Sequence, residues 1–155
     1  MYRLARPTDI KPILSLAKSL DMFAEDELVE IQARLNSYLE SLDGSIWIVI
    51  EEDGIEGVGY CAPEVMTNGT WNILMLLVRK DAQWQGHGSA LITKMQDAVA
   101  DRQGRLLIVE TSGVDDFEKT RRFYLKCEFL EVARIPDFYD AGNDKIVFSK
   151  PLSRV

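Results

Sequence analysis

The sequence is poor in the residues that build metal sites and disulfide frameworks: it has two cysteines and one histidine among 155 residues. Cys61 and Cys127 lie far apart and match no metal-ligand or redox spacing. We interpret both as reduced packing residues and expect no metal. Residues 1–12 carry several charges and no long apolar run, unlike a signal peptide or a membrane span. We therefore expect a cytoplasmic protein with no membrane partner.

The sequence has fewer basic than acidic residues. It contains 18 lysines and arginines and 25 aspartates and glutamates, which gives a formal net charge of -7. Nucleic-acid binding requires a basic face, since the phosphate backbone supplies most of the affinity. The composition therefore argues against a nucleic-acid partner. It leaves room for a cationic partner, such as an amine.

Internal repeats and low-complexity linkers are also absent. With 46% apolar residues, the chain suits one domain over residues 1–155 with a real hydrophobic core. Hydrophobic spacing predicts strands at 2–6, 46–50, 58–65, 71–78, 106–109, 129–135 and 146–148. It predicts helices at 7–17, 25–39, 89–102 and 116–126. The order indicates an antiparallel meander followed by a βαβ crossover.

The strongest chemical signal is the turn between the strand that ends at Val78 and the next helix. It reads Gln83-Trp84-Gln85-Gly86-His87-Gly88-Ser89-Ala90. A pyrophosphate needs converging backbone N–H donors, and a helix start supplies unpaired amides and the positive end of its dipole. A Gly-x-Gly fragment alone fits an ordinary loop equally well. The dinucleotide fingerprint is excluded because Leu91 occupies its third glycine position, and the P-loop because no Gly-Lys-Ser/Thr follows.

The segment 77–91 resembles, without an insertion, the coenzyme A motif of the GNAT superfamily of N-acetyltransferases, Gln/Arg-x-x-Gly-x-Gly/Ala. Trp84 and His87 depart from it, since they stand where small and aliphatic residues are usual. The segment 123–129 is similar to the superfamily's Phe-Tyr-x-x-x-Gly-Phe, with Glu128 in place of the glycine. The resemblance implies an α+β (mixed α/β) fold, with a mixed, mostly antiparallel, twisted sheet of about seven strands flanked by about four helices.

The resemblance also implies that acetyl-coenzyme A is the cosubstrate and that its acetyl group passes directly to an amine. A backbone N–H near Leu76 or Leu77, at the bulge the family has in this strand, would stabilise the thioester oxygen. Phe117 stands where many members have an asparagine that touches the pantetheine arm. The residues implied in coenzyme binding are Leu76, Leu77, Val78, Gln83, Trp84, Gln85, Gly86, His87, Gly88, Ser89, Ala90, Phe117 and Tyr124.

Tyr124 is the residue that the resemblance places beside the coenzyme sulfur. A phenol has a pKa of about 10 and a thiol about 8.5, so full proton donation is uphill by roughly 2 kcal/mol and hydrogen bonding to the thiolate is the larger expected contribution. Many relatives carry a glutamate on the fourth strand, but residues 71–77 contain no acid. Glu110 is then the candidate base, with Asp115 and Asp116 behind it. The alternative is that Glu110 pairs with an arginine or caps a turn.

The only histidine, His87, has an unperturbed pKa near neutrality and could be taken for the base. In the resembling motif its position lies within the phosphate loop, remote from the acyl group. We therefore interpret it as a packing or outer contact.

Acceptor choice in this superfamily lies in the first two helices and the last hairpin, where Phe138 and Tyr139 are the candidate substrate residues. The acceptor is expected to be a primary amine of a small molecule, an amino-acid derivative or a peptide or protein. Two alternatives stay open, a non-catalytic acyl-coenzyme A sensor or interaction module on the same fold, and a nucleotide-binding domain of another fold. A homodimer is compatible with the sequence.

Overall fold

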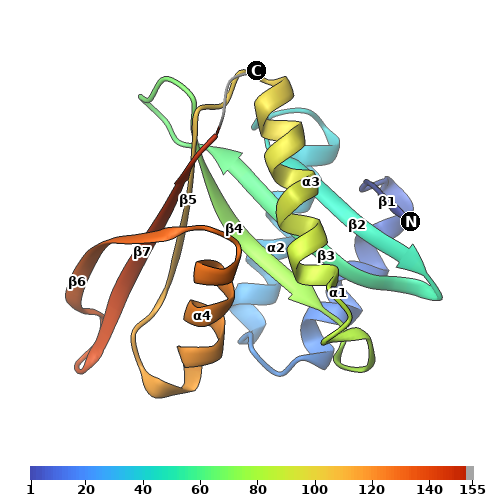
Figure 1. The fold of residues 1–155 in the computed structure, drawn as a ribbon. Helices are drawn as coiled ribbons and strands as arrows, with labels where there is room; N and C mark the ends of the chain where they lie inside the picture. The colour runs from blue at the N-terminus through green and yellow to red at the C-terminus, as the bar shows by residue number, and fades with distance from the viewer. Residues whose placement is uncertain (153–155) are drawn as a thin grey trace.

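Figure 1 shows the computed structural model of the chain, which describes residues 1–152. Seven strands form one sheet in the order β1-β2-β3-β4-β5-β7-β6. The strands are β1 (Tyr2–Leu4), β2 (Ile46–Glu52), β3 (Gly54–Pro63), β4 (Thr70–Val78), β5 (Leu106–Ser112), β6 (Leu130–Asp140) and β7 (Asn143–Pro151). The helices are α1 (Ile10–Ser19), α2 (Glu25–Leu39), α3 (His87–Asp101) and α4 (Glu118–Lys126), with short 3-10 turns η1 (Pro7–Asp9), η2 (Lys80–Ala82) and η3 (Asp115–Phe117).

The sheet is mixed and mostly antiparallel, which confirms the predicted fold class. Strands β1 to β4 form an antiparallel meander, α3 then crosses over to a parallel β5, and β7 and β6 close the sheet as an antiparallel pair. The parallel pairing of β4 with β5 covers only Thr70–Ile73 against Leu106–Val109. Beyond Ile73 and Val109 the two strands diverge, as Figure 1 shows.

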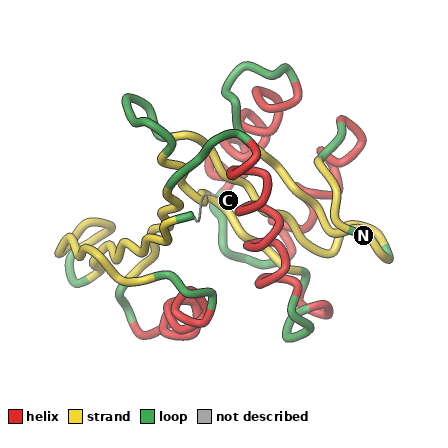
Figure 2. The backbone as a smooth tube through the Cα atoms, turned by 45° about the horizontal axis from the view of Figure 1, so that its top comes forward, coloured by secondary structure: helices red, strands yellow, loops and turns green. Residues whose placement is uncertain are grey.

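Helices cover both faces of the sheet (Figure 2). One buried cluster joins α3 and α4 to the sheet, and a second joins α1 and α2 to the opposite face. Strand β2 requires a helix layer on each face of the sheet, because its apolar side chains point to both faces. Ile48 packs in the first cluster and Val49 in the second. A strand buried on both faces reads as a continuous apolar run. Cys61 is buried and Cys127 partly buried, and both are free, as predicted.

A bulge interrupts β4. Tyr60 of β3 lies opposite Met75, whereas the next residue, Cys61, lies opposite Ile73, so Leu74 is the extra residue. The bulge thus lies two residues before Leu76, the nearer of the two residues beside which it was expected. The bulge reverses which side chains face each helix layer, because Ile73 packs on the α3 side and Met75 on the α1 side.

Most element boundaries differ from the sequence prediction. For example, β3 spans Gly54–Pro63 where 58–65 was predicted, and β7 spans Asn143–Pro151 where 146–148 was predicted. Strand β1 ends at Leu4, before residue 6, and α3 begins at His87, before residue 89. The final hairpin is longer than predicted, since β6 continues to Asp140. Its edge position explains this, because an edge strand accommodates Pro136 without losing a ladder hydrogen bond. Within residues 1–152, no helix is long and apolar enough to cross a membrane.

Candidate active site

The turn before α3 presents backbone donors at an open surface. Gly86 has a φ of 83°, and the first α-helical hydrogen bond runs from Ala90 N to Gly86 O at 3.0 Å. The N–H groups of His87, Gly88 and Ser89 therefore precede the helical ladder, at the positive end of the helix dipole. A Cβ on Gly86 would meet nothing within 4 Å. The turn thus combines the donors and the open approach that a phosphate group requires.

Two glutamine side chains of the turn stabilise it by hydrogen bonds to backbone carbonyls. Gln83 donates from Nε2 to the Val78 carbonyl at 3.0 Å, and Gln85 donates to the Asp81 carbonyl at 3.4 Å. Trp84, in contrast, is 86% exposed, and Lys119 Nζ lies 5.7 Å from its ring centroid. The glutamines therefore fix the shape of the turn, while Trp84 forms part of its outer surface.

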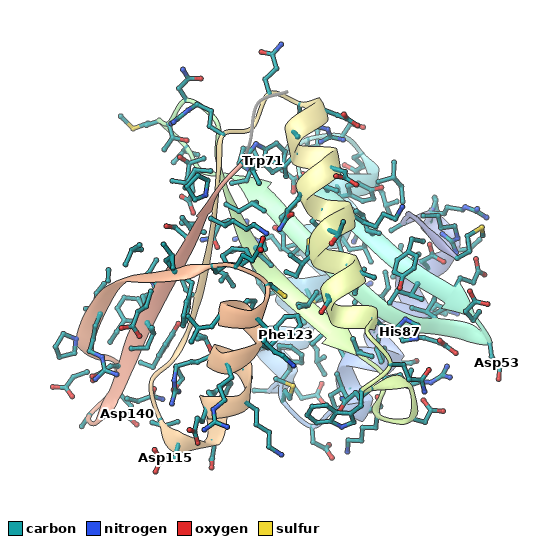
Figure 3. All side chains as sticks on the ribbon, viewed as in Figure 1. Asp53, Trp71, His87, Asp115, Phe123 and Asp140 are labelled. Atoms are coloured by element: carbon teal, nitrogen blue, oxygen red, sulfur yellow. The ribbon has the colours of Figure 1, made fainter. Side chains whose placement is uncertain are left out.

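His87 points toward β1 and β3. Its Nδ1 lies 3.2 Å from Tyr2 Oη, and its Nε2 lies 3.6 Å from Glu56 Oε2. Figure 3 shows His87 and Phe123 on opposite sides of the N-terminal end of α3. These contacts are those of a side chain that ties the turn to the sheet.

Tyr124 lies in the buried cluster that also contains Ile73 and Val109, the last paired residues of β4 and β5. It is 6% exposed and packs edge-on to Phe129. Burial raises the pKa of the Tyr124 phenol, so the hydroxyl stays protonated at neutral pH. Among the tyrosines of residues 1–152, the hydroxyls of Tyr2 and Tyr38 form side-chain hydrogen bonds, whereas that of Tyr124 forms none.

Two backbone N–H groups of β4 point into the space between β4 and β5. Arg79 donates its N–H to the Glu56 carbonyl of β3 at 2.7 Å. Successive N–H groups of an extended strand point to opposite edges, so those of Leu76 and Val78 face β5. Leu77, between them, points its N–H back to β3.

Glu110 is the first residue of β5 beyond its pairing with β4. Lys145 of β7 lies with its Nζ 3.0 Å from Glu110 Oε2 and 3.8 Å from the ring centroid of Phe138. Burial, and then the charge of Glu110, raise the pKa of Tyr139. The structure thus brings the candidate base together with both candidate substrate residues. The sequence analysis missed Lys145, whose only signal is the long-range pairing of β5 with β7.

The remaining candidates lie in η3, which follows β5. Phe117 is partly buried, and Asp115 and Asp116 are exposed. Arg121 of α4 donates to the carbonyls of Ser112 and Val114 at 2.8 Å, which anchors the end of β5. This anchor holds the segment between Glu110 and α4 in place.

Comparison with known proteins now identifies the class. The family model for the acetyltransferase (GNAT) domain matches residues 43–131, more than half of the chain. The protein therefore belongs to the GNAT family of acetyltransferases and is an acyltransferase. No curated protein matches the chain.

Solved structures agree over almost the full length. A protein from Desulfovibrio desulfuricans assigned to the GNAT family is 28% identical, with a TM-score of 0.93 and 99% of each chain covered. An aminoglycoside 6'-N-acetyltransferase complexed with coenzyme A is 15% identical, with a TM-score of 0.80 and coverage of 100% of this chain and 98% of that one. A ribosomal-protein-alanine N-acetyltransferase from Brucella melitensis is 15% identical, with a TM-score of 0.81 and coverage of 98% and 99%. These last two likenesses show the fold alone.

Proposed function

We propose that the protein transfers the acetyl group of acetyl-coenzyme A directly to a primary amine of a small molecule, an amino-acid derivative or a peptide or protein. The observation that carries this proposal is the turn at Gly86, where unpaired amides at the start of α3 follow the end of β4 and Gln83 donates a hydrogen bond to the Val78 carbonyl. Structural neighbours that bind coenzyme A and acetylate amines support it, including one solved with coenzyme A. We infer that this chain binds the coenzyme and acetylates an amine in the same way.

The residues present fit the coenzyme. The amides of His87, Gly88 and Ser89 would receive the diphosphate, because three donors converge at the positive end of α3. Leu76 and Val78 would offer their N–H groups to the pantetheine arm and the thioester oxygen. Preorganised donors of this kind stabilise the oxygen as it becomes negative.

Direct transfer needs no covalent enzyme intermediate. The neutral amine nitrogen forms a bond to the acetyl carbon, the carbon–sulfur bond breaks, and the nitrogen gives up a proton as the thiolate takes one. Tyr124 would hydrogen-bond the departing sulfur, and its raised pKa makes it a donor that remains protonated. Glu110 would accept the proton that an acceptor ammonium must lose before attack, directly or through water.

One observation favours the alternative of a non-catalytic acyl-coenzyme A sensor. The Glu110 carboxylate already pairs with Lys145 at 3.0 Å, and β4 carries no acid. A sensor would bind the coenzyme in the same place without turnover.

Calorimetric titration with coenzyme A, paired with release of coenzyme thiol from acetyl-coenzyme A across a panel of amines, tests the proposal. We expect binding, and turnover with at least one class of amine. Gly86→Glu should abolish binding, because it places a carboxylate where the diphosphate would lie. Binding without turnover of any amine would favour the sensor, and retained affinity in Gly86→Glu would remove the turn from the site.

A further inference from the structure

The pair formed by Glu110 and Lys145 lies on a part of the sheet that the helices leave open. Val109 and Ile146 pack in the α3 cluster, so their neighbours Glu110 and Lys145 point to the opposite face. On that face α1 and α2 pack mainly on β2, β3 and β4. The pair therefore borders the side from which an acceptor can reach the space between β4 and β5.

The two charges of this pair differ in their access to solvent. The Lys145 side chain is only 13% exposed, with the Phe138 ring 3.8 Å from its ammonium, whereas Glu110 is 31% exposed. The other carboxylate beside Lys145 in sequence, Asp144, pairs with Arg134 at 3.2 Å. Glu110 is thus the carboxylate that neutralises Lys145.

This arrangement restricts which amine can use Glu110. An acceptor ammonium that binds Glu110 competes with Lys145, and leaving the largely buried Lys145 ammonium without its partner is costly. An acceptor that also carries an anionic group removes this cost, because its anion pairs with Lys145 while its ammonium pairs with Glu110. Both protein charges then remain compensated, and two charge-assisted hydrogen bonds orient the amine.

We propose that the acceptor is an amine bearing a nearby carboxylate, namely a free α-amino acid, bound by exchange of ion-pair partners between Glu110 and Lys145. This inference rests on the proposed acetyl transfer and narrows its acceptor class. Phe138 and Tyr139, 49% and 46% exposed, form the adjoining wall and can contact an apolar part of the acceptor.

The test compares free amino acids with their matched amides and decarboxylated amines, using release of coenzyme thiol as the readout. Leucine, leucinamide and isopentylamine form one series, and phenylalanine, phenylalaninamide and phenethylamine form another. The remaining amino acids are tested in the same way. We expect kcat/KM for the free amino acid to exceed that of its amide and its amine by at least about tenfold.

Variants separate recognition from folding. Lys145→Met should raise KM for the amino acid by about tenfold and lower KM for the matched amine, because the amine then no longer competes with an ammonium for Glu110. Lys145→Arg should restore the preference for the amino acid. Lys150→Met is the control, since this lysine lies on the same strand and pairs with Glu128 at 3.6 Å, away from Glu110. Thermal unfolding of each variant verifies that it is folded.

Each outcome bears on one proposal. Equal or faster turnover of amides or amines overturns the amino-acid assignment and leaves acetyl transfer intact. The same holds if Lys145→Met changes KM equally for all three members of a series. Turnover of no amine at all overturns the proposed function itself.

Discussion

Gly88 of α3 and Phe123 of α4 are in direct contact, since a Cβ on Gly88 would lie 3.1 Å from Phe123 Cζ. The glycine therefore allows the two helices to approach each other at the start of α3, where the turn at Gly86 ends. Tyr124 follows Phe123, so this contact also sets the position of the candidate hydrogen-bond donor. The second glycine of the turn thus has a packing role as well as a place in the amide cluster.

Gly88→Ala tests that role. The added methyl group requires Phe123 to shift by a few tenths of an ångström, while alanine favours the helix by up to about 1 kcal/mol. We therefore expect a net loss of about 0.5–1 kcal/mol in the free energy of unfolding, measured in urea. The double variant Gly88→Ala with Phe123→Leu should recover most of this loss, because it removes the ring atoms that clash. An unchanged midpoint in the single variant would contradict the contact.

Gly86 has a different requirement, because its backbone is left-handed and the space around it is open. Gly86→Ala should weaken coenzyme A binding by about 5- to 30-fold, because a strain of roughly 1–2 kcal/mol shifts the free turn away from the left-handed conformation that presents the amides. Gly86→Asn should weaken it less, because asparagine tolerates the left-handed region. Calorimetric titration of both variants measures their dissociation constants for coenzyme A. An equal loss of affinity in the two variants would show that the added side chain blocks the coenzyme and that backbone strain is not the cause.

The element order, the βαβ crossover and the turn at Gly86 could be predicted from the sequence, because each depends on local spacing. The exact position of the bulge at Leu74 could not, since it appears only in the register between β3 and β4. The ion pair of Glu110 with Lys145 also escaped prediction, because the strands that carry these residues meet only after β7 inserts between β5 and β6. Long-range register leaves no local trace in composition or periodicity.

Tyr124→Phe separates catalysis from binding. The lost hydroxyl forms no hydrogen bond within residues 1–152, unlike those of Tyr2 and Tyr38, so the fold should lose little stability. We expect kcat to fall by about two orders of magnitude or more, with the dissociation constant for coenzyme A unchanged. Steady-state kinetics at a saturating acceptor concentration measures the first and calorimetry the second. Unchanged kcat would remove Tyr124 from the mechanism.

Glu128 occupies the position where the similar segment usually has glycine, and its φ of 70° explains that usage. Glu128→Gly should relieve a strain of about 1–2 kcal/mol while losing about 0.5–1 kcal/mol to the greater freedom of the unfolded chain. We therefore expect a modest net gain in the urea midpoint. Glu128→Gln, which keeps the Cβ, should show no such gain, and a gain there would assign the effect to charge.

The ion pair of Asp9 with Arg3 should make the stability of the protein depend on pH in the acid range. The Asp9 carboxylate receives hydrogen bonds from Arg3 at 2.7 and 2.9 Å and from the Arg6 N–H at 2.7 Å, with 5% of the side chain exposed. The Arg3 hydrogen bonds hold the pKa of Asp9 below its usual value. A pKa that is lowered in the folded state gives stability that is present above the unfolded value of about 3.9 and is lost as pH falls through the folded value.

Asp9→Asn should accordingly lower the free energy of unfolding by about 2–3 kcal/mol at pH 7, because it leaves one of the Arg3 contacts uncompensated. The difference from the parent protein should begin to shrink as the pH falls below about 3.9, where the carboxylate of the unfolded parent takes up a proton, and should be lost below the lowered pKa of the folded state. Glu30→Gln is the control, since Glu30 pairs with Arg34 at an exposed helix surface and should change stability by less than about 0.5 kcal/mol at either pH. Urea unfolding of all three proteins at pH 7 and pH 3 measures the effect. An Asp9→Asn deficit of the same size at both pH values would show that shape, and not charge, makes Asp9 important.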